Sequence, residues 1–487
     1  MIDIQASIHD NFSIEFKVGF HARRKVKIND FVMNTWIFIP DSLDINHLTY
    51  PREHFYRDIR DNIRLITPIF LMRDIARGDM IPLKHLEASF HKLASYPSRS
   101  SNADYEYQIK MFAAIFKSAL RDQIKYILSS AQPEDKGFLL DALIEDVRET
   151  LSKYRSLSTI IKTPTVSKES YNYFEFGDEF MSNIVDQQFL TLLHKLEESN
   201  QTLADEYRGK IISLVEAENQ YKKNQDYPVV SLDSPDNNRN LVFRRGVLKK
   251  FVESDLFLTA KKKKDGILVE QIYFSLAAGI SMIFATAVAF SFQRTYGNLT
   301  MPLFVALVVS YMLKDRIKEL MRYYFAHKRK AKYFDNKITV SIKDNIVGFS
   351  KEGFDFIPEK KVPKEILQIR NRSALLEADN RYTNEKIMLY RKLLQIDRSK
   401  LDESSKYFVS GLNEIIRFNV QSFLSKMDNP ETILFCINEK GELIQTLGAK
   451  VYYLNFIIQL KYLDFESYKR YRVVFNREGI KEIEEML

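Results

Sequence analysis

Residues Ile272–Phe292 read IYFSLAAGISMIFATAVAFSF, and these 21 residues contain no charged side chain. A helix needs about 20 apolar residues to cross the hydrocarbon core of a bilayer. A buried helix of a soluble domain rarely runs this long without a charge. The stretch therefore predicts a transmembrane helix over about residues 270–292 and an integral membrane protein.

A second apolar stretch, Leu299–Leu313, follows a short polar connection. It covers only about 22 Å at 1.5 Å per residue. It can cross a bilayer if Tyr296–Asn298 extend it and Lys314 reaches the interface. We expect a second span over about residues 297–313, and the alternative is a re-entrant segment. The two stretches together predict a two-helix transmembrane hairpin over residues 267–313.

The basic residues behind the formal net charge of +8 gather beside this hairpin. Residues 261–264 and 314–332 hold 12 Lys or Arg against two acids, a net of +10, which leaves −2 for the rest of the chain. The connecting loop carries only Arg294. Because Lys and Arg collect on the cytoplasmic side, we predict a two-pass protein with both termini in the cytoplasm. The residues expected at the membrane surface are Lys261, Lys262, Lys263, Lys264, Lys314, Arg316, Lys318, Arg322, Lys328, Arg329, Lys330 and Lys332.

Small side chains recur every four residues along the first span, at Ala277, Ser281, Ala285 and Ala289. Such a stripe allows another helix backbone to approach closely. The sequence leaves two partners open: the second helix of the same hairpin, or another copy of the chain in a homo-oligomer. The other expected partners are proteins and a lipid bilayer with an anionic inner leaflet.

The chain before the hairpin changes from strand to helix patterning. Residues 12–20 alternate strictly between apolar and other side chains, which is typical of a half-buried strand. A second apolar run at Val32–Ile39 completes the prediction of a small N-terminal antiparallel sheet within residues 1–50. Residues 51–221 repeat apolar side chains at helical spacing and predict a helical bundle.

Two further segments separate this bundle from the membrane. Residues 222–240 carry two prolines and several Asn and Asp residues, a composition typical of a linker. Residues 241–266 predict a basic amphipathic juxtamembrane segment. Such a segment lies either on the anionic leaflet or on a domain surface, and both alternatives stay open.

After the hairpin we expect a basic helical stalk over residues 314–334 and a cytoplasmic α+β domain over residues 335–487. Strands are expected at 432–437 and 442–447, and alternating apolar residues predict a further strand at 452–462, whereas 408–424 is interpreted as a helix. The predicted fold class is therefore a membrane-anchored α+β protein whose last domain contains an antiparallel meander.

Catalytic and metal-binding patterns are missing from the sequence. The eight histidines have no zincin spacing, and glycine, at 15 of 487 residues, forms no phosphate-binding motif. We expect no metal and no cofactor, and no residue can be assigned to catalysis. The lone Cys436 lies in an apolar run and is predicted to be a buried strand thiol. The acids Glu175, Asp178 and Glu179 are interpreted as the start of a helix, where carboxylates are favoured.

The leading hypothesis for function is a non-enzymatic, membrane-anchored scaffold or sensor facing the cytoplasm, which acts through protein contacts and self-association. One alternative is an enzyme with a cryptic site in the N-terminal cytoplasmic domain. The other is an oligomeric effector that perturbs the membrane. The charge distribution argues against nucleic acid as a partner, because a nucleic-acid-binding protein spreads basic residues over a domain face.

Overall fold

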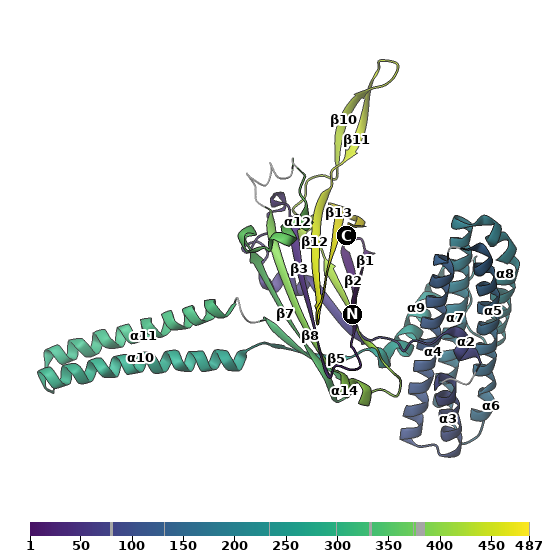
Figure 1. The fold of residues 1–487 in the computed structure, drawn as a ribbon, viewed down its shortest axis with the longest axis horizontal. Helices are drawn as coiled ribbons and strands as arrows, with labels where there is room; N and C mark the ends of the chain where they lie inside the picture. The colour runs from purple at the N-terminus through teal and green to yellow at the C-terminus, as the bar shows by residue number, and fades with distance from the viewer. Residues whose placement is uncertain are drawn as a thin grey trace. The chain divides into compact units, whose positions relative to one another are not determined.

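The computed structural model describes residues 1–77, 81–130, 132–232, 234–298, 300–330, 334–373, 375 and 385–486. The chain is an α+β protein with antiparallel sheets, and it divides into two compact units. The sheet unit contains residues 1–63, 258–406 and 410–487, and the helical unit contains residues 64–257 with 407–409. Each unit is described by itself below (Figure 1).

Two large sheets form the sheet unit within the described residues. The first has the order β1 (Ile2–Asp10), β2 (Ser13–His21), β9 (Gly411–Asn419), β4 (Ile59–Leu65). The second has the order β14 (Gly479–Glu485), β13 (Phe465–Asn476), β12 (Tyr452–Tyr462), β3 (Ile28–Ile39), β8 (Lys386–Asp397), β7 (Asn345–Ile357), β6 (Asn336–Ile342), β5 (Thr259–Lys264). Short helices join them: α1 (Arg52–Asp58), α12 (Lys364–Arg370), α14 (Arg398–Glu403) and α15 (Gln421–Leu424).

Aromatic side chains from the two sheets pack against each other and form the core of this unit. Phe16 on β2 meets Phe456 on β12 with ring centroids 5.3 Å apart, and Phe20 meets Phe31 on β3 at 5.4 Å. All four rings are almost fully buried. The alternation in residues 12–20 thus produces a strand with one face in a core between two packed sheets.

The prediction of a separate N-terminal sheet is wrong. Strand β3 pairs on one side with β12 and on the other with β8, and β2 pairs with β9. Residues 1–50 therefore belong to one unit with residues 335–406 and 410–487, instead of forming a separate domain. Alternation along a strand specifies which face is buried, but it carries no information on which distant strand lies beside it.

The helix expected over residues 408–424 is also wrong, because most of this segment is strand β9. Leu412, Ile416 and Phe418 are buried in alternating positions along it. Residues 412 and 416 share a face in either a strand or a helix, so the spacing was ambiguous. The other strands predicted in this domain correspond to β10 (Glu431–Ile437), β11 (Leu443–Ala449) and β12.

The helical unit is a bundle of long helices. Its elements are α2 (Met72–Ala76), α3 (Ile81–Ser95), α4 (Arg99–Ser129), α5 (Pro133–Ser156), α6 (Ser158–Ile161), α7 (Lys168–Ser199), α8 (Gln201–Asn224) and α9 (Pro235–Glu253). Side-chain caps begin three of the helices: Ser98 caps α4, Ser167 caps α7 and Asn200 caps α8. Each cap accepts a hydrogen bond from a backbone N–H that would otherwise lack a partner.

Helix α9 covers the first part of the segment that was predicted to be juxtamembrane. Its apolar residues Leu241, Leu248 and Val252 are buried in the helical unit. On the same helix, Arg244 forms a two-pronged ion pair with Glu179 of α7. This places α9 on a domain surface, which is the second of the two alternatives. The linker expected over residues 222–240 is therefore limited to the residues between α8 and α9.

Helices α10 (Ile267–Tyr296) and α11 (Met301–Lys330) run side by side as a pair (Figure 1). Among the described residues, one helix, Val269–Tyr296, is long and apolar enough to cross a membrane, with a mean hydropathy of 1.9. In α11 the charged residues begin at Lys314, so its apolar part is shorter. Membrane insertion of the pair, and the second span, stay predictions.

Strands β10 and β11 form a separate two-stranded hairpin in which nearly every residue is exposed. Large apolar side chains are among them: Phe435 is 67% exposed and Ile437 72%. Cys436 is exposed as well, so the predicted buried thiol is wrong. An apolar run of this kind is typical of a core strand, but β10 pairs with β11 alone in a two-stranded sheet.

This exposure predicts rapid chemical modification of Cys436 in the folded protein. It is the single cysteine of the chain, so a maleimide reagent is expected to add one label per chain under native conditions. A matched control is Ser350→Cys in a Cys436→Ser background. Residue 350 lies on β7 and is fully buried. That variant should label on the order of 100-fold more slowly, because labelling must wait for local opening. Equal rates for the two thiols would contradict the exposed hairpin.

Candidate functional site

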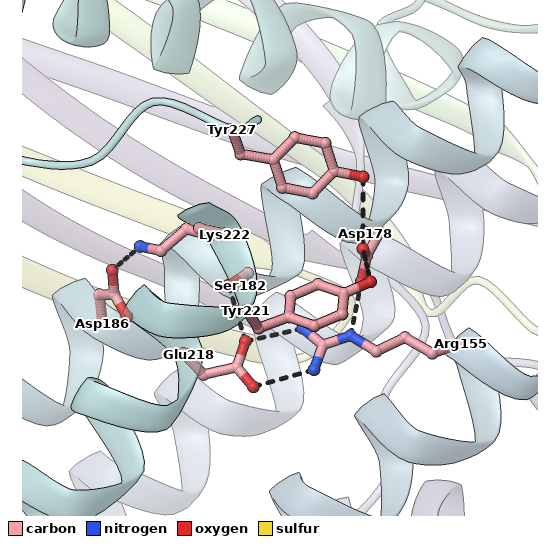
Figure 2. Close-up of polar contacts among 8 residues, drawn as sticks. All are labelled: Arg155, Asp178, Ser182, Asp186, Glu218, Tyr221, Lys222 and Tyr227. Carbon is pink, nitrogen blue, oxygen red and sulfur yellow. Dashed lines mark hydrogen bonds and ion pairs between the residues drawn. The ribbon is translucent and has the colours of Figure 1, made fainter. Parts of the chain in front are cut away.

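A network of charged side chains lies inside the helical unit, between helices α5, α7 and α8 (Figure 2). Arg155 of α5 is at its centre. Its Nε donates to Asp178 of α7 at 2.9 Å, and its two terminal nitrogens donate to the carboxylate of Glu218 of α8 at 3.0 and 2.7 Å. The guanidinium also stacks over the ring of Tyr221, 3.5 Å from its centroid. One arginine therefore joins two buried carboxylates from two helices.

Hydroxyl groups complete the hydrogen bonding of these two carboxylates. Tyr221 donates to Asp178 at 2.7 Å and Tyr227 at 3.4 Å, while Ser182 donates to Glu218 at 2.7 Å. Burial still raises the pKa of Asp178 above its ordinary value, against the opposing charge of Arg155. Burial also disfavours the charged form of Arg155. The hydrogen bonds that Arg155 donates to Glu218 outweigh this effect and raise the pKa of Arg155. The network has the character of a structural ion-pair core.

A second buried pair lies about two helical turns beyond Asp178 along α7. Lys222 of α8, which is fully buried, donates to Asp186 of α7 (Figure 2). Burial raises the pKa of Asp186, although Lys222 opposes this. Only one oxygen of Asp186 is used by this pair, and its Oδ1 has no hydrogen-bond partner. This carboxylate marks the point where the charged core meets an open space.

Two hollows flank this end of α7. The first, of about 460 Å³, lies between α7, α8 and residues 229–230. The second, of about 470 Å³, lies between α7, α9 and α4. Both are lined by Gln187 of α7 and Arg245 of α9. Their volumes are in the range of small-molecule sites. We regard the two hollows as the candidate site of this protein.

The packing stripe that the sequence singled out lies between α10 and α11. Ala277 and Ser281 are buried, as are Ala306 and Ser310 of α11, and Ala285 and Ala289 are half-buried. The Ser310 hydroxyl donates to the backbone oxygen of Ala285 at 3.4 Å. The stripe is thus occupied by the second helix of the same hairpin.

The basic residues expected at a membrane surface are divided between a strand and a helix. Lys261–Lys264 belong to β5, and Lys262 pairs there with the buried Glu352. On α11, Arg322 lies over the ring of Phe274 of α10, 5.0 Å from its centroid. Lys314, Arg316 and Lys318 lie on the same helix, half-buried or exposed. Lys328, Arg329 and Lys330 belong to the α11 backbone, their side chains being outside the described part, and Lys332 lies outside the described residues.

The acids of residues 175–179 do not start a helix. Helix α7 begins at Lys168, so Asp178 and Glu179 lie about three turns inside it, fully buried against Arg155 and Arg244. A signal for this existed in the sequence. Asp178, Ser182 and Asp186 recur every four residues beside the apolar face of the same helix. Polar residues at that spacing on a buried face require partners from neighbouring helices.

The chain matches no protein-family model, no curated protein and no solved structure. Functional inference therefore depends on the geometry described above.

Proposed function

We propose that this chain is a membrane-anchored, non-enzymatic sensor, in which α10 and α11 hold the two folded units at the cytoplasmic face of a bilayer. The observation that supports the anchor is the uncovered apolar surface of α10, of which only 11% of the most apolar part is buried. Outward side chains such as Ile280, Ile283 and Phe290 are 45–70% exposed. An apolar surface this large on a soluble protein would be an aggregation hazard, whereas lipid covers it at no cost.

The two hollows of the helical unit favour a sensor over a scaffold, since a scaffold has no need of a hollow of small-molecule size. The second hollow is lined by amides, cations and apolar side chains, and the first adds the carboxylate of Asp186 and the hydroxyl of Thr191, a mixture suited to binding a small molecule. Self-association has less support from the stripe, because α11 already occupies it. Both termini are proposed to be cytoplasmic on the distribution of Lys and Arg.

The anchor predicts that the full chain stays in the membrane pellet after alkaline carbonate washing and is released by detergent. Replacing both Ile280 and Ile283 by Lys should move a large part of it to the soluble or aggregated fraction. Each charge at the centre of a span costs about 2.5–3.5 kcal/mol during insertion. A control is Phe138→Lys, at an exposed apolar position on α5 of the helical unit, which should leave the chain in the membrane fraction.

Reporter fusions test the topology in the same cells. A reporter at Met1 or Leu487 is expected to signal from the cytoplasm, and one inserted at Gly297 from the opposite side. Release of the wild-type chain by carbonate would contradict the anchor. A terminal reporter that signals from outside would contradict the orientation alone.

A further inference from the structure

The second hollow contains a buried amide that the protein itself leaves without a partner. Asn183 of α7 is only 5% exposed and lines this space, yet neither its Nδ2 nor its Oδ1 makes a hydrogen bond. Leaving a buried polar group unpaired is costly, and native proteins seldom do so. Both amide atoms lie just beneath the lining of the hollow, so a molecule bound there gains one donor and one acceptor when this side chain turns toward it.

The charges around the same hollow are positive. Lys117 of α4 and Arg245 and Lys249 of α9 line it, and its lining includes no carboxylate. Lys117 is held by Glu253, with Nζ 2.5 Å from Oε1. Arg245, in contrast, has a buried Nε without a hydrogen-bond partner. An arginine with an unused donor, next to a lysine, is suited to a phosphate or carboxylate group.

Apolar side chains form another part of the lining. Phe180 and Ile184 of α7 and Val242 and Leu248 of α9 complete the lining. Two more amides, Gln187 and Gln188, lie beside Asn183 on α7. The space therefore offers an apolar surface for a flat ring, amides for the hydrogen-bonding edge of that ring, and cations for an attached anion. A nucleoside phosphate carries these three features in one molecule.

Gly246 of α9 is one of the residues that line the hollow. It lies in the middle of α9, where glycine destabilises a helix relative to alanine. A Cβ added at this position would meet no atom within 4 Å. Because Gly246 is part of the lining, a larger side chain there is expected to narrow the hollow without displacing protein.

We propose that the second hollow of the helical unit binds a nucleoside phosphate, with the phosphate on Arg245 and Lys249 and the base edge on Asn183. This proposal names the ligand class of the sensor. It rests on the proposed function only for what the binding is used for. Binding itself is measurable in detergent whether or not the anchor is correct, so the two proposals fail separately.

The test is calorimetric titration of the full chain in detergent with AMP, GMP, CMP and UMP, each compared with inorganic phosphate. At least one nucleotide is expected to saturate one site per chain and to bind at least about 10-fold tighter than phosphate. Arg245→Gln should weaken the binding of that nucleotide by about 10- to 100-fold, the usual effect of losing a charge-assisted hydrogen bond. Arg239→Gln, on the same helix but paired only with Asp236 at the surface, should leave binding unchanged.

Two further variants separate binding from folding. Asn183→Leu removes the unpaired amide at similar volume, so it should abolish the preference among bases while the melting temperature without ligand stays equal or rises. If Asn183 had a purely structural role, Asn183→Leu would instead lower the melting temperature without ligand. Gly246→Phe should abolish binding with the helical circular dichroism unchanged. Binding of phosphate alone, of no compound, or equally well to Arg245→Gln would each overturn the proposal.

Discussion

Replacing Arg155 by Met is expected to destabilise the helical unit by about 3–5 kcal/mol. The change removes one cation and leaves two carboxylates, Asp178 and Glu218, buried without a counter-charge. The side chain of Asp178 is completely buried, so water cannot replace the lost guanidinium. Since a whole protein is stable by only about 5–15 kcal/mol, the loss should be plain in denaturant unfolding followed by far-ultraviolet circular dichroism.

The expected cause can be tested by removing the carboxylates together with the arginine. In Arg155→Met combined with Asp178→Asn and Glu218→Gln no charge is stranded, so much of the lost stability should return. Arg121→Met is the matched control on α4. Its partner Asp122 is exposed, and such surface pairs contribute about 0–1 kcal/mol. A cost below about 1 kcal/mol for Arg155→Met would show that the network does not support the bundle.

Features encoded by neighbouring residues were predictable from the sequence. The charge-free run at Ile272–Phe292 lies inside the long helix α10, and the alternation at residues 452–462 is strand β12. The apolar faces of α7 and α8 were found because helical spacing is local. These features need no knowledge of which other segment is adjacent.

Features that depend on distant partners were not predictable. Strand β3 follows the N-terminus closely, yet it pairs with β12, more than 400 residues later. Likewise Asp178 was seen as one acid in a cluster, whereas its role depends on Arg155 and Tyr221 from two other helices. The hollow beside Asn183 requires α4, α7 and α9 to be placed first. Polar residues on an apolar helical face were the only local sign of this site.

The sheet unit contains a buried charge cluster of its own, between the two sheets. Lys392 of β8, which is 1% exposed, donates to Glu414 of β9 and, at 2.9 Å, to Asp61 of β4. Burial raises the pKa of Glu414 to about 8, although Lys392 opposes this. The charge of Lys392 keeps the pKa of Asp61 low, at about 2. At neutral pH the cluster therefore holds Lys392 and Asp61 charged and Glu414 protonated, with no net charge.

The stability of the sheet unit is therefore expected to fall as the pH rises from about 5 to about 8. In the unfolded chain Glu414 loses its proton near its ordinary pKa of 4.5, whereas the folded chain keeps it until about pH 8. The folded state binds more protons in this interval, so stability is fully present below pH 4.5 and declines by up to about 1.4 kcal/mol per pH unit. Asp61 and Lys392 titrate outside this interval, and their contributions stay constant within it.

Glu414→Gln should abolish this decline, because the amide imitates the protonated acid and cannot ionise. Near pH 8 the variant is expected to be more stable than the wild type by about 3–5 kcal/mol. The fluorescence of Trp36 measures this unit selectively, since it is the single tryptophan of the chain and is buried on β3. Glu478→Gln, at a fully exposed glutamate between β13 and β14, should keep the wild-type slope. An identical slope in Glu414→Gln would mean that Glu414 is already ionised in the folded protein, and that Lys392 neutralises it in full.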